Sequence, residues 1–371
     1  MTHRGWLKII EIGTGTPVLK PLNWRESNRI FVTTFIAVLA FVYIFILVVD
    51  PYGVVPFSLP FERPLTSSQR QMYPQILRTG RYDSIVVGTS TSRLLDPDAL
   101  DRVLGGHFAS LSMPAETAWE QVRVIDYFRR TVAAPGAVLI GLDHEWCDRG
   151  SSTYPAARTA VREKEFPTWA YDESRWNDLF HLLNIPTLEA ASRVVGYLLG
   201  KVKPRLRQDG FEVFVPPDSA YDLARARDKL RASAAQAHAT RDAAMTFPAL
   251  PWLDESLASL PGATRKFLVF PPVHVSALPV PGSPGAAREA ECKRRIAAIA
   301  GRRGALLADW RFASPLTTED SNYWDPLHYR LPIAYRLIDD LDHIVREGRE
   351  SPDGNYRILS PLKERAESAH R

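Results

Sequence analysis

Cysteine is scarce in this sequence and runs of like charge are absent. Each of these absences excludes or disfavours particular classes of protein. Two cysteines, Cys147 and Cys292, exclude a disulfide-rich scaffold and a zinc cage built from cysteine. Whether the two pair depends on their distance in the fold and on an oxidising compartment, so the sequence leaves this open. The formal net charge is only +4 and the basic residues are scattered, so we expect no nucleic-acid partner.

Spaced glycines and metal-ligand motifs are also missing. The segment G-T-S-T-S-R at 88–93 lacks the glycine spacing that a dinucleotide pyrophosphate requires, so a dinucleotide-binding protein has poor support. His144, Glu145 and His274 come nearest to a set of metal ligands, but their spacing matches no recognised zinc pattern. We therefore expect neither a metal nor a cofactor.

One long apolar run stands near the N-terminus. Residues 30–49 carry no charge, and a helix of this length crosses the hydrocarbon core of a membrane. A cleaved secretory signal would have a shorter apolar core and a small-residue cleavage site, whereas Asp50, Pro51 and Tyr52 follow here. The sequence therefore predicts a retained single-pass membrane anchor.

Basic residues are concentrated before this run. Five of them lie within residues 1–29, whereas the first one beyond the run is Arg63. Because positive residues flank a span on its cytoplasmic side, we expect 1–29 to be a cytoplasmic tail and the bulk of the chain to lie outside the cytoplasm. In a cell with two membranes that compartment is the periplasm. Residues 50–80, rich in proline and polar residues, are expected to form a connector with a helix over 67–79.

From residue 81 onward short apolar runs alternate with segments of helical periodicity. This alternation is typical of a parallel sheet covered by helices, so we expect an α/β domain over 81–346. The expected strands are 85–87, 107–113, 137–142, 266–270 and 305–309, and the expected helices are 96–103, 118–132 and 331–345.

Two regions do not fit the alternation. We interpret residues of about 150–260 as a helical insertion that shapes the site, with helices at 176–199 and 219–245, because a structureless loop of that length is unusual in a compact domain. Residues 347–371 are polar and are expected to form a mobile tail.

Two distant stretches carry residues typical of acyl-transfer chemistry. Gly88 permits a sharp turn after the strand at 85–87, and hydroxyl residues follow it, which taken alone would most often cap a helix. Asp325 and His328 stand three residues apart, so a helical turn or tight loop brings both to the same side. An Asp beside a His can orient the imidazole that takes a proton from a serine. Ser90, Asp325 and His328 are therefore a candidate triad.

With these stretches the sequence resembles the SGNH (GDSL-like) hydrolase superfamily. The G-T-S at 88–90 corresponds to the first motif, G-D-S, and the D-P-L-H at 325–328 to the terminal D-x-x-H. The resemblance covers roughly residues 80–345 and implies a flavodoxin-like α/β sandwich with a parallel central sheet. It implies Ser90 as nucleophile, His328 as general base and then acid, and Asp325 as its orienting partner.

The resemblance also implies three oxyanion donors: the N–H of the nucleophile, an N–H from a glycine in a second motif and an Asn side chain in a third. Ser90 supplies the first, but the second region, S-L-S-M-P-A-E-T, has no glycine, so Ala115 or a neighbour would donate. Asp143 stands at the Asn position, where an ionised carboxylate would repel an oxyanion. Either Asp143 is protonated, or a donor such as His144 or His274 replaces it, or the site is not a fast hydrolase.

His144, Trp146, His274 and Trp324 follow predicted strands or adjoin the Asp-His segment, so they are candidates for lining a substrate pocket. Resemblance to anchored relatives that work on polysaccharide acetylation or teichoic-acid D-alanylation implies a serine esterase or O-acyltransferase. It would act through an acyl-enzyme on an acylated envelope glycan or another ester. The alternative, motivated by Asp143 and the missing glycine, is a non-catalytic binding or assembly component of an envelope-polysaccharide machine.

Overall fold

The structure is a computed structural model in which the described residues are 7–10, 18–21, 23–66, 68–148, 166–237 and 245–361. The chain divides into two compact units. The first unit comprises Met1–Arg63 and Ser174–Val202, and the second comprises Pro64–Glu173 and Lys203–Arg371. Residues 174–202, part of the region predicted as a helical insertion over 150–260, therefore group with the first unit.

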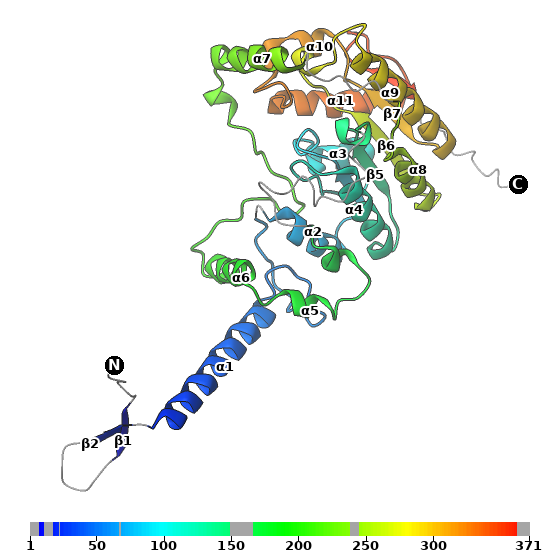
Figure 1. Cartoon of the computed structure of the whole chain (residues 1–371). Coiled ribbons are helices and arrows are strands. Elements are labelled where there is room, and N and C mark those ends of the chain that lie inside the picture. The colour runs from blue at the N-terminus through cyan, green and yellow to red at the C-terminus, as the bar shows by residue number, and fades with distance from the viewer. Residues whose placement is uncertain are drawn as a thin grey trace, which may run out of the picture. The chain divides into compact units, whose positions relative to one another are not determined.

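The second unit is built on a six-stranded sheet with the strand order β4-β3-β5-β6-β7-β8 (Figure 1). Its strands are β3 (Ser84–Val87), β4 (Phe108–Ser110), β5 (Ala137–Gly141), β6 (Arg265–Phe270), β7 (Leu306–Asp309) and β8 (Arg357–Ser360). The first five run parallel and β8 pairs antiparallel with β7. The predicted α/β architecture with a mostly parallel sheet is thus confirmed.

Helices cover both faces of this sheet. On one face α3 (Pro97–Leu104) packs against α11 (Leu331–Glu347), and both join a core cluster with inward side chains of the strands. Alternate strand residues point to the opposite face, where α4 (Ala118–Thr131) packs on β3 and α9 (Pro284–Arg303) on β7 and β8. The remaining helices of this unit are α2 (Gln69–Arg78), α7 (Leu223–Ala237), α8 (Leu250–Ser259) and α10 (Pro315–Thr318).

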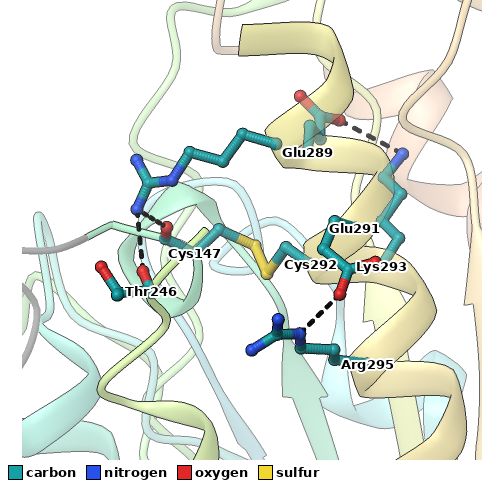
Figure 2. The surroundings of a disulfide bond; sticks show 8 residues. Cys147, Thr246, Glu289, Glu291, Cys292, Lys293 and Arg295 are labelled. Atoms are coloured by element: carbon teal, nitrogen blue, oxygen red, sulfur yellow. Dashed lines mark hydrogen bonds and ion pairs between the residues drawn. A yellow bond between two sulfur atoms is a disulfide. The ribbon is translucent and has the colours of Figure 1, made fainter. Parts of the chain in front are cut away.

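The two cysteines form a disulfide between the segment after β5 and α9 (Figure 2). Cys147 and Cys292 are 145 residues apart in sequence, so the bond closes a long loop of the unfolded chain, and closing long loops stabilises the folded state. Arg288 adds hydrogen bonds to the carbonyl oxygens of Cys147, at 2.6 Å, and Thr246, at 3.3 Å.

The first unit contains the apolar helix α1 (Trp24–Val49), the helices α5 (Asp178–His181) and α6 (Ile185–Leu198), and a hairpin of β1 (Leu7–Ile10) and β2 (Val18–Pro21). By its length and apolar composition α1 is able to cross a membrane. It begins before the predicted residue 30 because Asn23 and Glu26 form a capping box at its N-terminus.

Two local predictions were wrong, and a third is confirmed for the described residues. The predicted tail over 347–371 contains β8, and its residues beyond 361 lie outside the described residues. The helix predicted at 176–199 is divided into α5 and α6, because Asn184 caps a new helix that has a proline in its first turn. The helix predicted at 219–245 is observed as α7, and residues 238–244 are outside the described part.

The end of β5 packs tightly against the turn after β3. A Cβ atom on Gly141 would lie 1.8 Å from Ser92 Oγ and 3.0 Å from its Cβ, and one on Gly88 would lie 2.6 Å from the same oxygen. We predict that Gly141→Ala lowers the free energy of unfolding by about 1–3 kcal/mol, measured by urea denaturation, because it overpacks this contact.

Gly262→Ala is the matched control, since an added Cβ there meets nothing within 4 Å, and we expect a change within about 0.5 kcal/mol. Adding Ser92→Gly to Gly141→Ala removes the clashing atoms and should recover part of the loss. If the double variant is no more stable than Gly141→Ala, the overpacking does not arise at the contact with Ser92.

Candidate active site

Ser90, Asp325 and His328 come together although 238 residues separate the serine from the histidine. His328 Nε2 lies 2.8 Å from Ser90 Oγ, and His328 Nδ1 lies 2.9 Å from both carboxylate oxygens of Asp325. The side chains of Asp325 and His328 are 30% and 26% exposed. A nucleophile, a base and a group that orients the base are thus aligned by hydrogen bonds.

A closed loop holds the acid and the histidine on the same side. Asp325 Oδ1 accepts hydrogen bonds from the N–H groups of Leu327 and His328, both at 3.0 Å. The loop is closed by Trp324 N–H, which donates to the carbonyl of His328 at 2.9 Å. His274 N–H donates to the carbonyl of Pro326 at 2.9 Å and ties the loop to the segment after β6.

The Asp325 carboxyl group is held in its ionised form. Burial raises the pKa of Asp325, but hydrogen bonds from the His328 ring and from the N–H groups of Leu327 and His328 outweigh burial. The net result is a pKa below the ordinary value. An ionised carboxylate here keeps the proton on His328 Nδ1 and stabilises the imidazolium that forms when Nε2 takes a proton.

A segment of the second unit outside the predicted elements packs against the histidine. The ring of Phe214 meets the His328 ring edge-on with centroids 5.5 Å apart, and the guanidinium of Arg93 lies 4.5 Å over Phe214. Arg93 also pairs with Glu212. The sequence did not reveal these positioning contacts, because residues 211–214 carry no helical or strand periodicity and their partners are distant in the chain.

Asp143 anchors the turn that carries Ser90. Its buried carboxylate accepts hydrogen bonds from Thr89 Oγ1 and Thr91 Oγ1, the latter at 2.8 and 2.9 Å, and from Arg311 Nη2 at 2.8 Å. The expectation that Asp143 acts as an oxyanion donor is therefore corrected, since donors surround it and it acts as an acceptor. The hydroxyl residues after Gly88 likewise form a turn and do not start a helix.

Two backbone N–H groups remain as candidate oxyanion donors. Within the described residues, the N–H groups of Ser90 and Ala115 donate to no other group. Ala115 has a φ of +49°, a conformation that glycine adopts most readily. Met113 N–H donates to the carbonyl of Gly88 at 3.0 Å and holds this segment beside the nucleophile turn.

Glu116 is a buried acid next to Ala115 that the sequence did not single out. It is completely buried, and burial, followed by the charge of Glu120, raises the pKa of Glu116 well above its ordinary value. Its Oε2 accepts the N–H of Met113 at 3.3 Å. Nothing in the sequence indicated that Glu116 is buried, because most glutamates in proteins are exposed.

The four predicted pocket residues have different surroundings. Trp146 is fully buried and its Nε1 donates to Gln121 at 3.0 Å, so it belongs to the core and the pocket prediction for it was wrong. His274 is buried as well, with Ser276 at 2.8 Å and Asp320 at 3.2 Å, so it supports the Asp-His loop and replaces no oxyanion donor.

Trp324 and His144 are accessible. The Trp324 ring is half-buried beside Tyr221, with centroids 5.1 Å apart, close in sequence to His328. The His144 side chain is 70% exposed and 3.1 Å from Glu145, a contact that raises the pKa of His144. Among the described residues no group of three or more His, Cys, Asp and Glu side chains is placed to hold a metal.

Two cavities lie on the Arg311 side of the site. One of about 460 Å³ is lined by Arg311, Lys293 and apolar residues of 275–281, and one of about 310 Å³ by Arg311, His144 and Cys147. Ser90 and His328 line neither cavity. His144 therefore belongs to a cavity beside the Asp143–Arg311 pair and not to the surroundings of the serine.

No family model matches the sequence, and no curated protein matches it either. The chemistry that this site can perform is therefore inferred from its own geometry.

Asp143→Asn should lower the free energy of unfolding by about 3–5 kcal/mol in urea denaturation, because it leaves the buried cation of Arg311 without its counter-charge. The matched control is Asp342→Asn, which breaks the exposed Asp342–Arg346 pair and should cost about 0–1 kcal/mol. Equal effects of the two substitutions would contradict an anchoring role. The double variant Asp143→Asn with Arg311→Met should lose less than the sum of the single losses.

Glu116→Gln should make thermal stability less sensitive to pH. A raised pKa means that folding favours the protonated acid, so this contribution is complete below the ordinary value of 4.5 and is lost as the pH rises through the folded value. We expect the melting temperature of Glu116→Gln, relative to the unsubstituted protein, to be higher at pH 8 than at pH 4.5. Glu255→Gln, at an exposed site, should show no such trend.

Proposed function

We propose that the protein is a membrane-anchored serine esterase or O-acyltransferase of the SGNH (GDSL-like) type. Its substrate would be an acylated glycan of the cell envelope or a related ester. The observation that carries this proposal is the chain of hydrogen bonds from Asp325 through His328 to Ser90. A serine that only capped a helix would have no need of a histidine at 2.8 Å with its own oriented carboxylate.

In the proposed reaction His328 Nε2 takes the proton of Ser90 Oγ as that oxygen attacks the ester carbonyl carbon. The carbonyl oxygen becomes an oxyanion, which the N–H groups of Ser90 and Ala115 stabilise. The bond to the alcohol then breaks, the alcohol leaves with the proton from His328, and Ser90 is acylated. Water or a sugar hydroxyl then attacks the acyl group with His328 as base, which gives hydrolysis or transfer and restores Ser90.

The side chain at position 143 limits the expected rate. Because Asp143 is an acceptor held by Arg311, the site has two backbone donors where SGNH enzymes have a third donor from an Asn side chain. Loss of one oxyanion donor costs on the order of 10²–10³ in rate in known cases. We therefore expect slow turnover of simple esters.

Two observations support a location of the second unit outside the cytoplasm. Five basic residues lie before the uncharged run at 30–49, two of them in the first turns of α1, and the first one beyond the run is Arg63, as expected of a cytoplasmic N-terminus. The Cys147–Cys292 disulfide lies in the second unit, and disulfides persist in oxidising compartments. Together they favour the periplasm or the cell exterior as the site of action.

A binding or assembly component of an envelope-polysaccharide system is the second candidate. It is favoured by the carboxylate at position 143, which lowers the catalytic capacity of the site without disturbing the fold around it. The two candidates differ in whether Ser90 turns over an ester.

Ser90→Ala and His328→Ala should each lower hydrolysis of p-nitrophenyl acetate by the detergent-solubilised full-length protein by about 10²-fold or more, because each removes a member of the proton-transfer chain. Ser92→Ala is the matched control. Its hydroxyl is fully buried in the same turn and has no hydrogen-bond partner among the described residues, so turnover should be retained. Unchanged turnover in folded Ser90→Ala would remove the serine from the mechanism.

A further inference from the structure

The segment 174–202 packs against the C-terminal part of α1. It belongs to the same compact unit as α1, and α6 packs against that helix (Figure 1). The hydroxyl of Tyr43 donates to the carbonyl oxygen of Leu179 at 3.0 Å. Tyr43 lies six residues before the last residue of α1, so its backbone is about 9 Å from the end of the helix at about 1.5 Å per residue, and Leu179 lies within reach of its side chain.

The chain that follows α1 is fixed by buried polar contacts. The Asp50 carboxylate accepts the N–H groups of Val54 and Val55 at 3.0 and 3.2 Å, and Arg63 Nε donates to the carbonyl of Asp50 at 2.5 Å. Arg175 in turn donates to the carbonyl oxygens of Val54, at 3.2 Å, and Val55. The end of α1 and the beginning of the segment 174–202 are therefore held together.

This segment exposes large apolar side chains, which we call the apolar face. They are Trp176 (65% exposed), Phe180 (86%), Leu183 (43%), Ile185 (73%), Leu198 (53%) and Leu199 (68%). In the described part of the chain, every large apolar side chain that is more than half exposed belongs to the first unit, in α1, in this segment or at Phe57. Among its described residues the second unit has none, although it holds most of the chain.

The side of α6 opposite the apolar face packs within the first unit. Thr187, Ala191 and Val194 are buried, so α6 has a packed side in addition to its exposed apolar ends. Arg193 and Lys201 are exposed and can approach anionic phosphate groups. A buried side, exposed large apolar residues and accessible cations are typical of helices that lie in the membrane interface.

We propose that the apolar face of α5 and α6 is embedded in the membrane leaflet at which α1 ends. The occupant is lipid because the hydrogen bond from Tyr43 places this segment level with the last turns of a helix that is itself long and apolar enough to span a bilayer. Exposed apolar patches of this kind are rare on water-facing surfaces. The first unit is then anchored in the membrane by α1, which spans it, and by α5 and α6, which lie in the plane of its interface. The proposal depends on α1 crossing the membrane and is independent of the chemistry of Ser90.

The test is the depth of nitroxide labels on the full-length protein in phospholipid nanodiscs. Single substitutions Phe180→Cys and Leu199→Cys are labelled without reductant, so that the Cys147–Cys292 disulfide stays closed. Val38→Cys, in the middle of α1, is the bilayer control, and Lys229→Cys, exposed on α7, is the aqueous control. Power saturation compares collisions with oxygen, which concentrates in lipid, and with a water-soluble nickel chelate.

We expect the labels at positions 180 and 199 to behave like the label at 38, with oxygen collisions favoured severalfold over nickel relative to position 229. Nickel accessibility equal to that at position 229 would overturn the proposal. Labels shielded from both reagents would also overturn it, because a protein would then cover the apolar face. Dipolar broadening between labels would identify that protein as a second copy of this chain.

Discussion

A buried carboxylate surrounded by one cation and two hydroxyl donors holds the turn that carries Ser90. Burying an ionised carboxylate is costly unless it is paired and hydrogen-bonded, and Asp143 satisfies both conditions through Arg311, Thr89 and Thr91. Asp143 follows β5, Arg311 follows β7 and the turn follows β3, so one group ties together the carboxyl ends of three strands. The turn contains no helix to stiffen it, so these side-chain hydrogen bonds, together with that from Met113 N–H to the Gly88 carbonyl, hold its shape.

The same group sets the limit on the proposed chemistry. A side chain that anchors the nucleophile turn as an acceptor cannot also donate to an oxyanion, so the developing charge has to be met by backbone N–H groups. One of these candidate donors belongs to Ala115, which follows β4 and has a left-handed backbone although it is not a glycine. In the proposed mechanism, the side chain at position 143 therefore stabilises the turn and does not stabilise the oxyanion.

Features with a local signal could be predicted from the sequence. The buried strands are continuous apolar runs, α1 is a long uncharged run, and the spacing of Asp325 and His328 is enough to place both side chains together. Contacts between distant segments could not be predicted. Arg311 lies 168 residues from Asp143, and β8 is only four residues long and is recognised as a strand through its pairing with β7.

The burial of individual side chains, like the contacts between distant segments, could not be predicted from residue type. Trp146 and His274 follow strands just as pocket residues do, yet both are buried, because the loops after β5 and β6 turn inward at these positions. The division of the predicted insertion between two units had no local signal either, since α6 is distinguished by its packing against α1.

Covalent labelling of the purified full-length protein with a fluorophosphonate, followed by peptide mapping, tests the central claim most directly. The reagent phosphonylates a serine whose proton a neighbouring base removes, with loss of fluoride, so it reports on the Asp325–His328–Ser90 chain without requiring the natural substrate. The account predicts phosphonate on Ser90 and none when His328 is replaced by alanine. An unlabelled Ser90 in a protein with an intact thermal transition would contradict an activated serine and would favour the binding or assembly role.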